Sequence, residues 1–401
     1  MRRLALALAI AAAGSAAHAG TLTLNYLGQT VVPTGTLFDG TTLGSPTGDE
    51  FGGLSGLDYN AATGRFTVIS DNRGERGNPR FYDMTLSYGL GGFTGITVHS
   101  QTKMLRPDGT PFPASPTPRQ VDPETIRIAP NGNLFISSEG NFNTDPTRLF
   151  QPFVRELTTA GVHVRDFAVP TQFNYVDSAT AGGRSNLLFE ASAVSKDGKT
   201  LFVGAENAIV QDGPIASLTL GSPSRITAYD IATGLPTAQY VYEVAPIPKA
   251  TPLPPGPSTF NDNGLVELLA ISDTQLLAME RSFASAVGNT IKIFLIDLAG
   301  ASDVSGIPSL ASASYTPVSK TLILDLETIG APLDNIEGMS WGPTLSNGRN
   351  SLVLVADNNF STDQFTQFLA FEVEGIPAPA GLSILAVAVP ALLAMRRRKS
   401  A

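Results

Sequence analysis

Acidic residues at both ends of one hairpin are the first feature of this sequence that could do chemistry. In "EASAVSKDGKTLFVGAEN", residues 190–207, Glu190 opens one alternating segment and Glu206 closes the next, with a turn at Asp197-Gly198 between them. The two strands of a hairpin run antiparallel, so both acids lie at the same end. Carboxylates gathered in this way could bind a divalent cation or act as general bases.

The same pattern recurs four more times along the chain. The other copies begin at Ser55, Glu124, Glu267 and Glu337, and successive starts are 66 to 77 residues apart. In every copy the second predicted strand closes with an acid. These closing acids are Asp71, Glu139, Glu206, Glu280 and Asp357.

The segments between the copies supply further strands. Two predicted strands follow each of the first four copies, one follows the last, and residues 21–28 can supply the missing one. This pattern predicts an all-β β-propeller of four-stranded blades, closed by N- and C-terminal strands in one sheet. We count five blades, and extra strands in the segments 29–54 and 245–262 would make a sixth. A two-sheet sandwich is the alternative, but five similar units at this spacing fit it poorly.

Propeller geometry brings the repeated acids together. The start of each innermost strand and the end of the second strand face the same mouth of the central channel. Such like charges are costly unless they are protonated, paired or bound to metal, and Ca²⁺ is the cation that best suits an oxygen-only ring. We therefore expect a ring of metal-ligating acids at this mouth. Its members are Asp71, Glu124, Glu139, Glu190, Glu206, Glu267, Glu280, Glu337 and Asp357.

Other residues of the same copies could complete this site, and a simpler interpretation stays open. Arg73, Arg127 and Arg281 could pair with the acids or hold an anionic substrate. Asparagines that follow the second acids could add amide oxygens. Alternatively, any single strand-end acid could cap a turn or accept bonds from neighbouring backbone N–H groups.

Composition excludes several classes of function. With no cysteine there is neither a disulfide nor thiolate chemistry, and a net charge of −9 disfavours nucleic-acid binding. "GGLSGL" around Ser55 lacks the second glycine of a nucleophile elbow. His99 and His163 fall in predicted outer strands, so a Ser-His-Asp triad is not expected.

Both ends of the chain have the composition of processing signals. Residues 1–19 combine two arginines, an apolar run and a small-residue cleavage site, which predicts a signal peptide and export. Residues 376–401 contain Pro-Ala-Pro, about 16 apolar residues and a basic cluster, which could form a short transmembrane helix. This tail resembles the PEP-CTERM sorting signal of Gram-negative bacteria, which implies processing by an exosortase and delivery to the cell surface or matrix. The propeller domain is then residues 20–375.

The repeats also carry a resemblance to a known family. "GGLSGLDYNAATGRFTVISDN", "DPETIRIAPNGNLFISSEGN" and "DNIEGMSWG" are similar to motifs of the phytase-like propeller family labelled "esterase-like activity of phytase". The resemblance implies hydrolysis of phosphoric esters, with calcium held among acids at the channel mouth. It implies that the first-strand glutamates act as inner ligands or bases and that the second-strand acids complete the ring.

Together these features predict an exported, calcium-dependent phosphoesterase that acts as a monomer on a small anionic substrate. In this hypothesis Glu190 and Glu267 are the catalytic bases and Arg281 holds the substrate. Two alternatives remain: a non-catalytic binding propeller of the surface or matrix, and a lactonase-like propeller hydrolase.

Overall fold

The computed structural model describes residues 22–115, 118–176, 180–256 and 259–375. The predicted signal peptide and sorting tail lie outside these residues. Within the described ranges there is no helix of the length and hydrophobicity that a membrane span requires. Over the described residues, regular structure consists of strands and two short 3-10 helices, η1 (Thr171–Phe173) and η2 (Leu326–Ile329).

Five four-stranded antiparallel sheets, the blades, account for most of the strands in the described part of the chain, as predicted. The innermost strands of blades 1 to 5 are β5 (Leu54–Asn60), β9 (Pro123–Ile128), β13 (Ala191–Val194), β17 (Gly264–Ala270) and β21 (Asn335–Trp341). Their second strands are β6 (Arg65–Ser70), β10 (Leu134–Ser138), β14 (Thr200–Gly204), β18 (Gln275–Ala284) and β22 (Asn350–Asp357).

Two outer strands complete each blade. The third strands are β7 (Arg80–Gly89), β11 (Phe153–Leu157), β15 (Ser222–Asp230), β19 (Gly288–Asp297) and β23 (Phe365–Glu374). The fourth strands are β8 (Gly92–Lys103), β12 (His163–Asp166), β16 (Pro236–Val244), β20 (Ser319–Asp325) and β1 (Thr23–Pro33).

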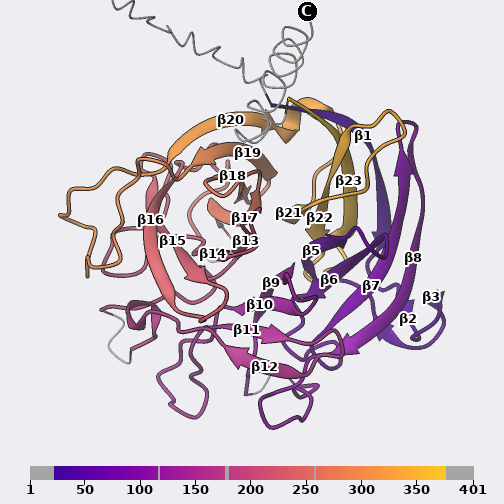
Figure 1. Ribbon diagram of the computed structural model, residues 1–401, viewed down its shortest axis with the longest axis horizontal. Helices are drawn as coiled ribbons and strands as arrows, with labels where there is room; N and C mark the ends of the chain where they lie inside the picture. Colours follow the sequence, from indigo (N-terminus) through magenta and orange to yellow (C-terminus); the bar gives the residue numbers. More distant parts are fainter. Residues whose placement is uncertain (1–21, 116–117, 177–179, 257–258, 376–401) are drawn as a thin grey trace, which may run out of the picture. The chain divides into compact units, whose positions relative to one another are not determined.

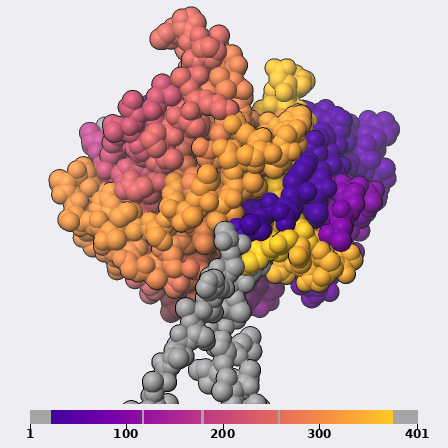
Figure 2. All heavy atoms as spheres, turned by 90° about the horizontal axis from the view of Figure 1, so that it is seen from above, coloured from indigo at the N-terminus to yellow at the C-terminus, as the bar shows by residue number. Residues whose placement is uncertain are grey.

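The blades form a closed ring. Innermost strands contact one another in the cyclic order β5, β9, β13, β17, β21 and back to β5 (Figure 1). The first strand of the chain, β1, is the outer strand beside β23, so N- and C-terminal strands share the fifth blade. Figure 2 shows the same closure, with indigo N-terminal residues lying against yellow C-terminal ones. The predicted propeller and its closure are confirmed.

A sixth sheet lies in the segment 29–54 but is not a further blade. It contains β2 (Leu37–Phe38), β3 (Leu43–Ser45) and β4 (Asp49–Glu50), which pair only with one another. The described part of the segment 245–262 contributes only a single bridge, between Asn261 and Ala284. The described residues therefore form five blades around the axis.

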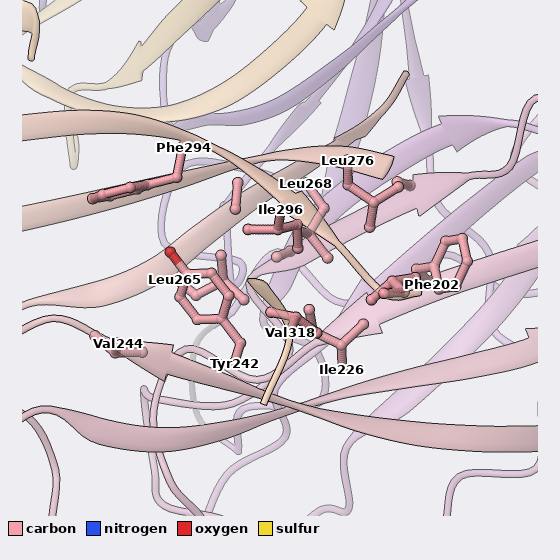
Figure 3. Packing of buried hydrophobic residues seen from close by; sticks show 14 of the residues in the cluster. Phe202, Ile226, Tyr242, Val244, Leu265, Leu268, Leu276, Phe294, Ile296 and Val318 are labelled. Atoms are coloured by element: carbon pink, nitrogen blue, oxygen red, sulfur yellow. The ribbon is translucent and has the colours of Figure 1, made fainter. Parts of the chain in front are cut away.

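Turn chemistry and apolar packing explain why the repeats fold in this way. Gly132 and Gly198 have φ of 85° and 70°, the left-handed conformation that Asn-Gly and Asp-Gly turns supply without strain. Facing sheets then bury alternate side chains against each other. Between blades 3 and 4, for example, Phe202 and Tyr242 pack with Leu268 and Phe294 (Figure 3). This packing holds the innermost strands in register around the axis.

Candidate metal and substrate site

Five of the nine predicted acids line one cavity of about 610 Å³ at the expected mouth of the ring. A cavity of this size suits a small ligand. Arg73 and Arg281 line the same cavity. The five acids are Asp71, Glu124, Glu190, Glu337 and Asp357.

The glutamates that line this cavity lie at the start of the innermost strands, and two of them lie in β-bulges. In blade 5 the pairing skips Glu337, and in blade 2 it skips across Glu124. In blade 3, Glu190 directly precedes the first paired residue of β13. A bulge removes a residue from the ladder and changes the direction of its side chain. Blade 1 has its bulge at Ser55, whose hydroxyl donates to the carbonyl of Glu124 at 2.8 Å.

Blade 4 departs from this pattern by one residue. Its bulge falls at Val266, between Leu265 and Glu267, so Val266 takes the place that a glutamate takes in blades 2, 3 and 5. On β18, Arg281 is opposite Gly264, as Asp357 is opposite Asn335 in blade 5. An arginine therefore occupies the position of the second-strand acid. A slip of one residue moves a strand side chain to the other face, and both predicted acids of this blade lie outside the cavity.

Glu267 was expected to be a catalytic base and a metal ligand. It instead forms an ion pair with Arg127 on the axis below the cavity, and this pair is called the plug. Oε2 of Glu267 lies 2.5 Å from Nη2 of Arg127, and its Oε1 accepts from the backbone N–H groups of Ser192 and Leu268. Arg127 is 2% exposed and donates to one carbonyl from each innermost strand. The accepting residues are Leu57, Ile126, Ser192, Leu268 and Met339.

Glu280, the other acid of blade 4, is also fully engaged within the protein. Its carboxylate accepts from the hydroxyl of Tyr242 at 2.8 Å and the side-chain amide of Asn263 at 3.0 Å, and it pairs with Lys320. These partners belong to strands β16 and β20 and to the loop before β17. The expectation of a ring of nine acids fails for Glu267 and Glu280 because each already has internal partners.

In contrast, the first-strand glutamates of blades 2 and 3 lack hydrogen-bond and ion-pair partners among the described residues. Glu124 and Glu190 are only 4% and 8% exposed, yet neither carboxylate forms a hydrogen bond or ion pair with any described residue. Glu139 is fully buried; one oxygen accepts from the N–H of Leu188, and the other has no partner among the described residues. Glu124, Glu139 and Glu190 each place an oxygen within 4.8 Å of the others, and Asp71, Asp122 and Glu124 form a second such group.

Burial and mutual repulsion both act on these groups. Burial, followed by the charges of neighbouring carboxylates, raises the pKa of Glu124, Glu139 and Glu190 well above the ordinary value. The same causes raise the pKa of Asp122 to about 8 and the pKa of Asp357 well above its ordinary value. Protonation or a bound cation would relieve this repulsion.

Two arginines offset part of the charge. Arg73 lies 2.5 Å from Asp122 and 3.0 Å from Asp71. Arg281 lies 3.1 Å from Asp262, 3.3 Å from Glu337 and 3.6 Å from Glu206. Burial nevertheless raises the pKa of Glu337 to about 7 and that of Glu206 to about 8, although Arg281 acts against this rise.

The donor set fits a hard divalent cation. The two groups contain only carboxylate oxygens, and Oε2 of Glu139 is buried without a partner among the described residues. Calcium and magnesium prefer oxygen ligands, and a cation would replace the protons that the buried carboxylates otherwise need. Glu124, Glu139 and Glu190 are the residues best placed to hold it.

The expected amide ligands and the histidines lie elsewhere. The asparagines after the second-strand acids bind backbone groups of neighbouring loops; these are Asn72, Asn141, Asn207 and Asn358. His99 contacts Thr85 on β7, and His163 contacts Asp166 on β12, in the outer strands as expected.

Sequence reasoning missed four acids of the site, among them Asp334 and Asp363, which line the cavity. Asp122 precedes β9 and joins the second acidic group, while Asp262 precedes β17 and binds Arg281. In the sequence, Asp122-Pro123 and Asp262-Asn263 each place an acid just before a predicted innermost strand. This position could have indicated that both acids reach the mouth. Two aromatic residues in the cavity wall, Phe260 and Phe283, had no such signal.

A propeller with an acid-lined cavity at the mouth of its axis is the class of protein that fold and site define. The phytase-like family, described as "Esterase-like activity of phytase", matches residues 49–360, most of the chain. The protein therefore belongs to the phytase-like family. A search of the curated proteins finds no match.

Two solved propeller structures are similar to this chain at low identity. The periplasmic gluconolactonase of Pseudomonas aeruginosa has 13% identity and a TM-score of 0.33, and the match covers 90% of this chain and 98% of that one. The propeller of Dos1 has 6% identity and a TM-score of 0.33, with 80% and 68% covered. Similarity at this level carries no argument about function, and the blade architecture rests on the chain's own strand pairing.

Proposed function

We propose that this protein hydrolyses phosphoric esters in the mouth cavity with the help of a divalent cation, calcium by preference. The observation that carries the proposal is the group formed by Glu124, Glu139 and Glu190. Their oxygens lie within 4.8 Å of one another, and the carboxylates of Glu124 and Glu190 have no partner among the described residues. A protein that buries such a group without donors requires protons or a cation there.

The residues of the cavity divide the chemical work between them. A cation held by these three glutamates would supply a Lewis acid that stabilises negative charge on a phosphoryl oxygen. Arg281 reaches the same cavity, and its buried Nε has no partner among the described residues, so it is free to donate to a second phosphoryl oxygen. Glu190 thus becomes a ligand in this account, whereas Arg281 keeps the substrate-holding role expected of it.

Glu337 is the best candidate for moving the proton. It lines the cavity and lies 3.3 Å from Arg281, and burial raises its pKa to about 7, which suits proton transfer near neutral pH. A water oxygen bonds to phosphorus as the ester P–O bond breaks. Glu337 takes a proton from the water and returns one to the leaving oxygen, which yields an alcohol and phosphate and leaves the carboxylate unchanged.

A phosphomonoester panel tests this function on the purified protein, with calcium and then with EDTA. We expect turnover only with calcium, and we expect Glu124→Gln and Glu190→Gln to lower it at least ~100-fold. Calorimetric titration with calcium should show weaker binding by both variants. Glu243→Gln, an exposed glutamate on β16, is the matched control and should change neither measurement.

Three other results would overturn the proposal in different directions. Turnover of lactones without phosphate release would indicate a lactonase-like hydrolase. Calcium binding without turnover of either class would indicate a binding scaffold of the surface or matrix. Unchanged calcium binding in Glu124→Gln and Glu190→Gln would remove the site itself.

Export belongs to the same proposal. The basic and apolar residues of segment 1–19 and the Pro-Ala-Pro tail support secretion followed by sorting at the cell surface. Fractionation of the native host, with detection of the mature N-terminus by mass spectrometry, tests this. A full-length chain retained in the cytoplasm would contradict it.

A further inference from the structure

The mouth cavity has an apolar wall as well as an acidic one. Phe260, Phe283, Leu333 and Phe365 line it together with the carboxylates. Phe260 is 56% exposed, a large apolar side chain left open at the entrance of a charged cavity. Such exposure at a concave site is typical of a surface that a ligand covers.

The backbone of Phe260 is held by two hydrogen bonds to Ser285 although Phe260 lies in a loop. Its N–H donates to Oγ of Ser285 at 2.9 Å, and its carbonyl accepts from the N–H of Ser285 at 2.9 Å. The next residue, Asn261, forms a bridge with Ala284 at the end of β18. A side chain whose backbone is already ordered loses little further entropy when a ligand packs against it.

The two rings form an open pair. The centroids of Phe260 and Phe283 lie 6.4 Å apart, with 34° between their planes. In this tilted arrangement the exposed ring of Phe260 remains available to a third aromatic group. Aromatic rings at such separations attract one another in offset or edge-to-face geometry.

The negative charge of the cavity wall limits the number of phosphate groups that a ligand can carry. Acids outnumber the arginines Arg73 and Arg281 in the wall of the cavity, and both arginines already pair with acids. A single divalent cation leaves an excess of negative charge, which disfavours a substrate with several phosphates. One phosphate group directed at the cation is compatible with this excess. The cavity acids are Asp71, Glu124, Glu190, Asp262, Asp334, Glu337, Asp357 and Asp363.

We propose that the substrates are monoesters of a single phosphate with an aromatic alcohol, whose ring packs on Phe260 and Phe283. The proposal rests on the proposed phosphoesterase function and adds the substrate class to it. Blade 4 supplies both the arginine that meets the phosphate and the rings that meet the leaving group, since Phe283 lies two residues after Arg281 on β18.

Binding of unreactive phosphonates tests the wall separately from catalysis. We use calorimetry on the full chain with calcium, comparing phenylphosphonate with methylphosphonate. The wild-type protein should bind the phenyl compound ~10-fold more tightly, the magnitude of one aromatic contact. Phe260→Ser and Phe283→Ser should reduce this ratio to below ~3-fold, and Phe260→Tyr should retain it.

Leu235→Ser is the matched control, because this leucine is 55% exposed in the turn between β15 and β16 and does not line the cavity. It should leave the ratio unchanged. Thermal unfolding of each variant verifies that it folds, and the exposure of Phe260 makes its serine variant the safer of the two. The ratio of kcat/KM for phenyl phosphate and glycerol phosphate should follow the binding ratio.

The outcomes separate the two proposals. A phenyl preference that depends on Phe260, without turnover of any ester, supports the aromatic wall and overturns the phosphoesterase function. Turnover with equal binding of both phosphonates, or with a preference that Phe260→Ser leaves intact, overturns the aromatic wall alone. Tighter binding of inositol hexakisphosphate than of phenylphosphonate also overturns it.

Discussion

Two layers of buried charge lie along the axis of the ring, and they differ in how their charges are compensated. In the plug, Arg127 and Glu267 lie 2.5 Å apart, and each also bonds to backbone groups of the innermost strands. In the mouth cavity, Glu124 and Glu190 are also buried but have no described partner. A buried charge whose partners are all within the protein is typical of a structural role. A buried charge without such partners is typical of a ligand-binding site.

Blade 4 shows how a single residue of register separates the two roles. Its bulge at Val266 places Glu267 in the plug, and Arg281 takes the position at which other blades place an acid. The mouth thereby gains the positive charge of Arg281 where a fourth acidic pair would have raised the repulsion further. This exchange gives the cavity an acidic side, from blades 1 to 3 and 5, and a side with arginine and phenylalanine.

The largest expected effect is in the plug. Arg127→Met should destabilise the protein by about 3–5 kcal/mol because it leaves the Glu267 carboxylate buried without its counter-ion. The double variant Arg127→Met/Glu267→Met should cost less than the single change. Denaturant unfolding measures both, and a cost for Arg127→Met below ~1 kcal/mol would refute the structural role of the pair.

Removal of a charge from the mouth should change the free energy of unfolding in the opposite direction. In EDTA at pH 8, Glu190→Gln should stabilise the protein by about 1–2 kcal/mol, since it removes a buried charge that lacks a partner. The same unfolding experiment measures this change. A destabilisation comparable to that of Arg127→Met would mean that Glu190 is already compensated and that the contrast between the layers is wrong.

The pH dependence of stability follows from the raised carboxyl pKa values. A carboxyl whose folded pKa lies above its unfolded value contributes stability below the unfolded pKa and loses it as pH rises through the folded pKa. Glu337 titrates at about 7, and Asp122 and Glu206 at about 8, from ordinary values of 4.5 for Glu and 3.8 for Asp. The metal-free protein should therefore lose ~5 °C of Tm between pH 5 and pH 9.

Calcium should reduce this loss because the proposed cation would bind the ionised carboxylates and not the protonated ones. Thermal scans at several pH values, with EDTA and with excess calcium, provide the comparison. A Tm that rises with pH in EDTA would contradict the assignment of raised pKa values at the mouth.

The smallest effect concerns the arginine of blade 4. Arg281→Met removes a positive charge from the cavity, so calcium affinity should rise by roughly 3–10-fold while phenylphosphonate affinity falls. Calorimetry measures both constants, and Arg281→Lys should restore the calcium affinity towards the wild-type value. Equal changes of the two affinities in one direction would contradict the proposed roles of Arg281.

Much of the fold follows from local sequence signals. Turns such as Asn131-Gly132, the alternating strands and the regular spacing of the copies were enough for five blades and their closure. Glu124, Glu190 and Glu337 line the cavity because in their blades the glutamate stands at the start of the innermost strand, the position that the repeat predicts.

The rest of the site depends on non-local structure. In the fourth copy the acid of the repeat is Glu267, but the residue at the structurally equivalent position is Val266. Only the strand pairing reveals this difference, because it places the bulge at Val266. The plug formed by Arg127 depends on carbonyls from all five blades, which no single repeat encodes. Phe260 enters the cavity from a loop fixed by Ser285, a contact without a sequence pattern.

The most direct test of the contrast between the layers is a crystal structure of the protein soaked with calcium. The account predicts a cation in the mouth cavity at ~2.3–2.6 Å from oxygens of Glu124, Glu139 and Glu190, and none at the Arg127–Glu267 pair. A mouth without a cation at saturating calcium, or a cation bound only outside this cavity, would contradict it.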